Sequence, residues 1–174
     1  NMRMNRLGNT GLLVSELCLG AMTFGGTGMW TAVGQVPQDG VNALIKDAVD
    51  GGINFIDTAD IYSTGLSEQM TGAALRTLGI KRSDVVIATK ALGAMGPGAN
   101  DRGASRYHLM HAIDASLERL GVDHVDLYQI HGWDPATPIE ETLRTLDDIV
   151  RSGRARYIGV SNWAAWQLMK ALGL

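Results

Sequence analysis

The sequence predicts an α/β fold: a (β/α)8 barrel, preceded by a β-hairpin, of which the chain holds the first five strand–helix units. Short apolar runs alternate with longer segments of helical period, roughly every 30–35 residues, which is typical of repeated βαβ units. Polar residues follow nearly every apolar run, and barrel enzymes build their sites from the ends of several strands. The first strand leads into Gly20-Ala21-Met22, not into the G-x-G-x-x-G fingerprint of an open doubly wound sheet. The barrel is therefore preferred to the open sheet.

The N-terminal region predicts a hairpin, because two short apolar pieces flank an Asn- and Gly-rich turn within residues 5–14. Residues 16–20 are the first predicted strand of the barrel, and a glycine-rich loop follows at 25–30. A helix is predicted over 39–50, because its apolar residues recur on one side and two glycines end it.

The next two units follow the same pattern. Strands are predicted over 53–56 and 84–88, where short segments are mostly apolar. A helix over 67–78 lies between them, and a third helix carries an apolar stripe over 109–120 before Gly121 ends it.

The last two units begin with a predicted strand over 125–130. Residues 137–140, Thr-Pro-Ile-Glu, match a capping box with proline at the first helical position, so a helix is predicted to start there. A fifth strand is predicted over 156–160, and Asn162 is the expected N-cap of a final helix.

Five units in 174 residues are fewer than a closed barrel contains, since such barrels typically need about 250 residues. We therefore expect residues 1–174 to form one domain that is the first five-eighths of a barrel, a fragment of a longer enzyme. The first and fifth barrel strands would then be unpaired edges that favour association with another chain. Self-association of this partial barrel is the alternative that we keep.

The composition excludes several other classes of protein. Apolar residues make up 45% of the chain and charged residues 19%, and the net charge is −3, which is ordinary for a globular protein and offers no basic surface to nucleic acid. No segment approaches the roughly 20 apolar residues that span a membrane, and no signal peptide is recognised. The single cysteine, Cys18, lies in an apolar run and is expected to be buried and inert. A cytoplasmic protein is predicted.

Ionisable side chains stand at the ends of three predicted strands. Asp57, Lys90 and His131 each end or directly follow an apolar run, and Tyr62 lies five residues after Asp57. A charge at the end of a buried strand needs a partner, and Asp57 and Lys90 on neighbouring strands can supply it to each other. A lysine ammonium stabilises the phenolate of an adjacent tyrosine, which makes the phenol a competent general acid toward a carbonyl oxygen.

His131 could donate a hydrogen bond to the same carbonyl oxygen and stabilise the developing alkoxide. No side chain can supply the hydride for such a reduction, so a redox cofactor is implied.

Two other histidines, His108 and His111, lie three residues apart on the third helix. No cysteine or carboxylate set accompanies them, so we interpret them as solvated helix residues.

With these residues in place, the sequence resembles the aldo-keto reductase superfamily over nearly its whole length. The motifs that carry the resemblance are LGNTGLLVS at 7–15, GINFIDTA at 52–59 with Tyr62, IATK at 87–90, SLERL at 116–120, DLYQIH at 126–131 and IGVSN at 158–162. The resemblance implies reduction of aldehydes and ketones with NADPH, or with NADH as the alternative. It also implies that the last three strands of the complete barrel grip much of the cofactor, so five units alone should bind NADPH weakly or not at all.

The resemblance further implies a role for each site residue. Tyr62 would be the proton donor, Lys90 and Asp57 would tune it, and His131 would position the carbonyl group. Ser161 and Asn162 match the pair that holds the nicotinamide carboxamide, and Met22 and Asp57 would lie close to cofactor and substrate. Trp30 and Trp133, on loops at the barrel mouth, are candidates for the substrate pocket, which would suit an apolar or aromatic carbonyl compound. No metal is implied.

Within the superfamily, the Gly25-Gly26 loop and residues 134–141 resemble bacterial reductases related to the potassium-channel β subunits. Those β subunits carry asparagine where this chain has His131, so the histidine favours a working reductase. A non-catalytic subunit that senses nicotinamide cofactor is the second functional alternative. A homo-oligomer is compatible with either activity, and the substrate itself is not predicted.

Overall fold

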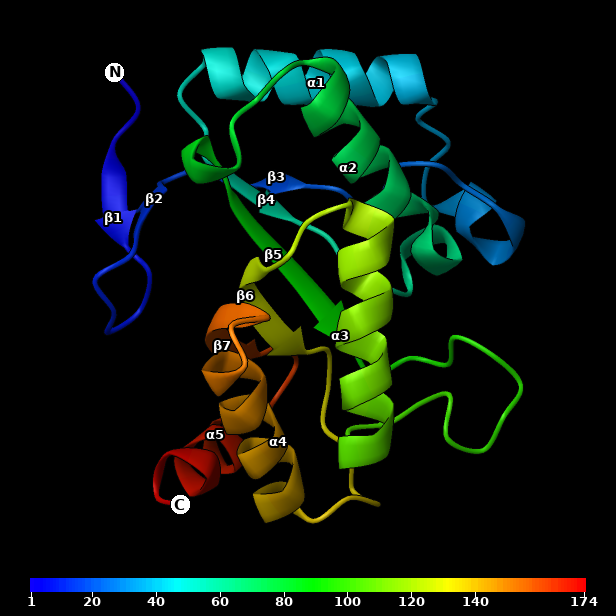
Figure 1. The fold of residues 1–174 in the computed structure, drawn as a ribbon, viewed down its shortest axis with the longest axis vertical. Coiled ribbons are helices and arrows are strands. Elements are labelled where there is room, and N and C mark those ends of the chain that lie inside the picture. Colours follow the sequence, from blue (N-terminus) through cyan, green and yellow to red (C-terminus); the bar gives the residue numbers. More distant parts are fainter.

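Five short apolar segments form a parallel sheet whose strands lie side by side in chain order. The computed structural model, which describes residues 1–174, gives the order β3–β4–β5–β6–β7 (Figure 1). Their bounds are Leu19–Gly20 for β3, Phe55–Asp57 for β4, Val86–Ala91 for β5, Val125–Ile130 for β6 and Ala155–Val160 for β7. A doubly wound sheet reverses its strand order at a switch point. The sequential order observed here is the barrel pattern, and it confirms the predicted succession of five strand–helix units.

Helices connect these strands and follow one another around the sheet in Figure 1. They are α1 Gln38–Asp50, α2 Leu66–Thr77, α3 Arg106–Leu120, α4 Ile139–Arg151 and α5 Ala165–Leu172. Neighbouring helices pack on each other in chain order from α1 to α4. All five helices were predicted, and the apolar sides of α1 to α4 supply buried core residues such as Ile45, Leu109 and Leu146.

The two faces of the sheet differ, because successive strand residues point to opposite sides. In β5, Ile87 and Ala91 belong to the core beneath the helices, and Thr89 donates a hydrogen bond to Glu68 of α2. Lys90 therefore projects from the other face, which the helices do not cover. This inner face is where a barrel of this type collects its polar strand-end residues.

The N-terminal hairpin is present as predicted. β1, Met4–Arg6, pairs antiparallel with β2, Leu13–Ser15. Ser15 fixes the hairpin to the start of β4: its backbone N–H donates to Asn54 Oδ1 (2.8 Å), and its hydroxyl oxygen accepts from the Asn54 backbone N–H (3.1 Å). The hairpin thus lies at the amino ends of the strands, away from the ends that carry Asp57, Lys90 and His131.

The first barrel strand is shorter than predicted. Only Leu19 and Gly20 pair with β4, because the backbone N–H of Glu16 still donates to Arg3 and so extends the hairpin ladder. The prediction that Cys18 is buried is wrong: its side chain is exposed, since β3 is an edge strand with no neighbour on its outer side. Partial burial, with the charge of Asp57, still raises the pKa of the Cys18 thiol to about 11.

Two predicted helix starts are also wrong in detail. Helix α4 begins at Ile139 with Pro138 as its N-cap and no capping side chain, because the Thr137 hydroxyl donates instead to Asp134 (2.7 Å). Helix α5 has Ala164, not Asn162, as its N-cap. Asn162 adopts a left-handed conformation (φ 57°) that leads the chain out of β7.

On helix α3, the prediction that both histidines are solvated is wrong for one of them. His111 is exposed as expected, but His108, with only 4% of its surface exposed, is buried, and its Nδ1 lies 3.1 Å from the carbonyl oxygen of Asn100. The loop before α3 folds back on the helix and covers this ring.

None of the helices combines the length and the apolar character that crossing a bilayer requires.

Candidate active site

A buried lysine stands at the centre of the inner face. Lys90 leaves β5 with 5% of its surface exposed and donates from Nζ to Asp57 Oδ2 (2.6 Å), to the Thr58 carbonyl oxygen (3.0 Å) and to the Tyr62 hydroxyl oxygen (3.2 Å). All three ammonium hydrogens therefore have acceptors. Such full pairing is what allows an ammonium group to remain charged away from water.

Asp57, the partner predicted for Lys90, is held from a second side. Gln129 Nε2, on β6, donates to Asp57 Oδ1 (3.1 Å) across the intervening strand β5, so each carboxylate oxygen accepts one side-chain hydrogen bond. We did not predict Gln129 as a site residue. The signal was present, because side chains two positions apart in a strand share a face and Gln129 lies two residues before His131.

Tyr62 is presented by a strained turn. It opens the 3-10 helix η2, Tyr62–Gly65, in which Ser63 (φ 48°) and Thr64 (φ 51°) are left-handed, a conformation that is unfavourable for residues other than glycine, asparagine and aspartate. The Ser63 hydroxyl accepts from the Gly26 backbone N–H (2.8 Å) and donates to the Phe24 carbonyl (3.2 Å). These bonds tie the turn to the loop after β3 and fix the direction in which Tyr62 leaves the backbone.

Two rings flank Tyr62. The rings of Trp30 and His131 each lie 5.7 Å from its ring, measured between centroids, in edge-to-face arrangements. Burial, followed by the charge of Lys90, lowers the pKa of His131. His131 is therefore neutral at pH 7, so it can donate one N–H without bringing a second positive charge beside the lysine.

Ser161 and Asn162, at the end of β7, lie next to His131. Asn162 Nδ2 donates to the His131 carbonyl oxygen (3.0 Å) and to the Ser161 hydroxyl oxygen (3.0 Å). Asn162 Oδ1 and the Ser161 hydroxyl hydrogen remain available to a ligand. An amide oxygen and a hydroxyl are the acceptor and the donor that a carboxamide group needs, so this pair fits the nicotinamide carboxamide.

The remaining predicted residues lie in different surroundings. Met22, at the mouth, has 45% of its surface exposed. Trp133 packs edge-on against Trp163 (4.9 Å between ring centroids) and lies 5.8 Å from Trp166. It belongs to a three-tryptophan cluster that joins the loop after β6 to α5. Among the predicted pocket residues, Trp30 is therefore the one that contacts Tyr62.

The hydrogen-bond directions at Lys90 determine what the site can do. Because Lys90 donates to the Tyr62 oxygen, the hydrogen of the Tyr62 hydroxyl is free to point at another acceptor. A carbonyl oxygen placed between Tyr62 and neutral His131 would receive one hydrogen bond from each. The arrangement can therefore protonate and stabilise an oxygen that gains negative charge.

Comparisons with known proteins identify the family that this sequence matches. The profile of the Aldo/keto reductase family matches residues 16–173. A probable voltage-gated potassium channel subunit beta of Arabidopsis thaliana is 41% identical over 99% of this chain and 50% of its own length. A versiconal hemiacetal acetate reductase of Aspergillus parasiticus is 42% identical over 95% of this chain and 52% of its own. The chain spans about half the length of these curated relatives.

A solved structure agrees with the sequence relatives. The aldo-keto reductase AKR11C1 of Bacillus halodurans, in its holo form, superposes with a TM-score of 0.84 at 31% identity, and it covers 99% of this chain and 54% of its own. The likeness extends over all five strand–helix units, together with the hairpin that precedes them.

Proposed function

Because the chain belongs to the aldo/keto reductase family, we propose that its protein reduces aldehydes and ketones to alcohols with NADPH. One observation carries the proposal. A buried ammonium group, that of Lys90, binds the Asp57 carboxylate and the Tyr62 hydroxyl at the same time. A lysine that only balanced a carboxylate would have no need of a phenol as its further acceptor.

Tyr62 is the proposed proton donor. In this role the Tyr62 hydrogen passes to the carbonyl oxygen as that oxygen becomes an alkoxide, and the Lys90 ammonium stabilises the phenolate that remains. Asp57 keeps Lys90 in place and is itself kept in place by Gln129. His131 donates a second hydrogen bond to the carbonyl oxygen and so sets its position.

The nicotinamide cofactor supplies the hydride when it is bound. Ser161 and Asn162 are the proposed contacts to its carboxamide, because their free acceptor and donor suit that group. Met22 and Asp57 are proposed to lie beside the cofactor and the substrate. The preference for NADPH over NADH follows from family resemblance, as does the cytoplasmic location, and both stay predictions.

The substrate class proposed is a small apolar or aromatic carbonyl compound. Trp30 lies edge-on to Tyr62, and Met22, on the loop after β3, is exposed. An aromatic side chain beside the proton donor favours apolar substrates over sugars or acids, and Met22 is proposed to add a thioether to the same pocket. Trp133 is the second predicted pocket residue, but its ring contacts are to Trp163 and Trp166 and not to Tyr62.

A second candidate function follows from the channel-subunit relative. A subunit that binds nicotinamide cofactor and signals its redox state would need Ser161 and Asn162 but not turnover. The Lys90–Tyr62 contact distinguishes the two functions, because only catalysis needs an ammonium group beside the phenol that gives up its proton.

The test is the oxidation of NADPH by the complete protein in the presence of an aromatic aldehyde such as benzaldehyde. Replacing Lys90 with methionine removes the ammonium that holds the Tyr62 oxygen, so we expect kcat to fall by about 10²- to 10⁴-fold. Lys46→Met, at an exposed site in α1, is the matched control. Unchanged kcat and an unchanged pH–rate profile in the Lys90 variant would contradict the proposed role.

A further inference from the structure

The loop after β3 brings Trp30 to Tyr62, although none of its residues from 26 to 35 is buried. The main chain closes this loop at its base, where the Gly25 N–H donates to the Val36 carbonyl oxygen (3.0 Å). Burial of apolar surface is the main force that fixes a segment on a protein. Because the loop lacks such burial, the position of Trp30 depends on the few other contacts that the loop makes.

The hydrogen bonds that join residues 26–35 to the rest of the molecule all go to Ser63. The Gly26 backbone N–H donates to Ser63 Oγ (2.8 Å), and the Thr27 hydroxyl donates to the Ser63 carbonyl oxygen (3.4 Å). The other hydrogen bonds of these residues stay within the loop. Ser63 is therefore the single hydrogen-bond anchor of the loop beyond its base.

The anchor binds the loop at its neck. Gly26 has φ 97°, and a Cβ atom on it would lie 2.1 Å from the Gly34 carbonyl oxygen. Only glycine fits a position with this conformation and this close an approach of backbone. Backbone contact thus closes the neck, and the Gly26 N–H that leaves it is the one that Ser63 accepts.

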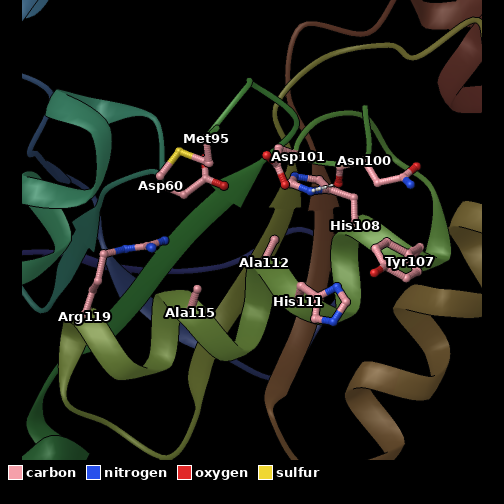
Figure 2. Close-up of a pocket in the computed structure, with 10 residues that line it drawn as sticks. All are labelled: Asp60, Met95, Asn100, Asp101, Tyr107, His108, His111, Ala112, Ala115 and Arg119. Atoms are coloured by element: carbon pink, nitrogen blue, oxygen red, sulfur yellow. Dashed lines mark hydrogen bonds between the residues drawn. The ribbon is translucent and has the colours of Figure 1, made fainter. Parts of the chain in front are cut away.

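Ser63 is held more firmly than the loop that it anchors. It is buried, and its hydroxyl also donates to the Phe24 carbonyl oxygen (3.2 Å). Two residues later, a Cβ atom on Gly65 would lie 2.7 Å from Arg119 Cδ, so the turn packs directly on this side chain. Figure 2 shows Arg119 leaving α3 in the direction of β5, and its Nε donates to Glu68 of α2 (2.6 Å). Helices α2 and α3 therefore support the turn.

The anchor sets Trp30 and the proposed proton donor at one spacing. Ser63 directly follows Tyr62 in the chain, and the rings of Trp30 and Tyr62 meet edge to face with 5.7 Å between their centroids. Rings in such contact leave no room between them. A carbonyl compound at Tyr62 must therefore lie beside Trp30, and the position of the Trp30 ring limits how wide that compound can be.

We propose that Ser63 is a positioning residue that selects substrates by width. Its hydroxyl group holds Trp30 beside Tyr62, which favours aromatic aldehydes with one ring over those with two. The inference rests on the proposed reductase function and adds to it a residue that the proposed chemistry does not use. Because Ser63 acts through Trp30, its loss changes the choice between substrates, and not only the rate of reduction.

The first test compares the NADPH-dependent reduction of benzaldehyde and 2-naphthaldehyde by the complete protein. Ser63→Ala removes the hydroxyl and frees the loop. We therefore expect the ratio of kcat/KM for benzaldehyde to kcat/KM for 2-naphthaldehyde to fall at least about fivefold. A Tyr62 side chain displaced without Trp30 would slow both reductions alike, so an unchanged ratio in Ser63→Ala would overturn the proposal.

Thr64→Ala is the matched control for this ratio. Thr64 is the next residue of the same turn and is also left-handed, but its side chain is exposed. The substitution removes a hydroxyl that does not hold the loop, so the ratio should stay that of the wild type. A ratio that fell as far in Thr64→Ala as in Ser63→Ala would show a general effect of the turn and would contradict the role of the Ser63 hydroxyl.

A second measurement follows the loop itself and needs no reductase activity. Chymotrypsin cleaves after tryptophan, and it reaches Trp30 when the loop leaves Tyr62. Mass spectrometry of the ligand-free protein should therefore show this cut at least about tenfold faster in Ser63→Ala than in the wild type or in Thr64→Ala. Equal rates would overturn the proposal. Faster cleavage in a protein that reduces neither aldehyde would contradict the proposed function, and substrate selection with it, while the anchoring of the loop would stand.

Ser63→Gly decides the matter where Ser63→Ala does not fold. Glycine also lacks the hydroxyl, but it adopts the left-handed conformation of this position (φ 48°) without strain. Both the substrate ratio and the cleavage rate should shift as expected for Ser63→Ala. Thr64→Gly, which relieves the same kind of strain and keeps the anchor, is the control. Wild-type values of both quantities in Ser63→Gly would overturn the proposal.

Discussion

At the scale of single residues, polar side chains lie on both faces of the sheet, and the two faces differ in how these side chains are paired. Lys90 and Asp57 are fully paired on the inner face, whereas Asp60, three positions after Asp57, is buried on the helix side without a donor. Their positions at strand ends correctly predicted that Asp57 and Lys90 pair with each other. Strand-end position could not predict that the Asp60 carboxyl lacks a hydrogen-bond partner. The surroundings of Asp60 come from Glu68, Arg119 and Tyr128, which lie on three other elements.

The pKa of Asp60 leads to a prediction about stability. A carboxyl whose pKa rises from 3.8 to about 7 on folding binds its proton more tightly in the folded state, so the free energy of unfolding falls as the pH rises between these values. The loss is about 1.4 kcal/mol per pH unit. Asp60→Asn removes this titration, so its free energy of unfolding relative to the wild type should rise by about 3 kcal/mol between pH 5 and pH 8.

Urea unfolding of both proteins at the two pH values measures this difference. Asp39→Asn, on α1, is the control and should leave the pH dependence of unfolding as it is in the wild type. Parallel curves for the wild type and Asp60→Asn would show that Asp60 is already ionised at pH 5.

At the scale of elements, the strands were easier to predict than the turns that end them. Apolar runs located all five barrel strands, but the caps of α4 and α5 were misassigned, because Thr137 and Asn162 bond to Asp134 and to the His131 carbonyl instead. The turn after β4 was not predicted at all. Its left-handed residues, Ser63 and Thr64, have no glycine or asparagine signal, and tertiary hydrogen bonds to the loop after β3 hold them.

This turn gives a prediction for Thr64. The residue is exposed and β-branched, so its left-handed conformation is unfavourable by about 1–2 kcal/mol, and asparagine tolerates that conformation better. Thr64→Asn should therefore raise the free energy of unfolding by about 0.5–1 kcal/mol. Thr77→Asn, in the right-handed last turn of α2, should change it little, because threonine and asparagine have similar helix propensities. Thermal unfolding that ranked the Thr64 variant at or below the Thr77 variant would contradict the strain at this turn.

At the scale of the whole molecule, the sequential strand order brings the proposed site together. Asp57, Lys90, Gln129 and His131 come from three adjacent strands, and β3 and β7 form the two free edges of the sheet. Exposed apolar residues lie beside both edges, among them Leu17 near β3 and Ile158 on β7. The relatives are about twice as long as this chain, so the activity proposed here is that of the complete protein.

The central claim, that Tyr62 protonates the substrate of an NADPH-dependent reductase, is tested most directly by Tyr62→Phe in the complete protein. NADPH consumption with benzaldehyde should fall by about 10²- to 10⁴-fold, while NADPH binding, followed by fluorescence, should persist. Tyr157→Phe, on β7 and outside the proposed site, is the matched control and should keep its activity. A Tyr62→Phe enzyme that turns over at the wild-type rate would contradict the account.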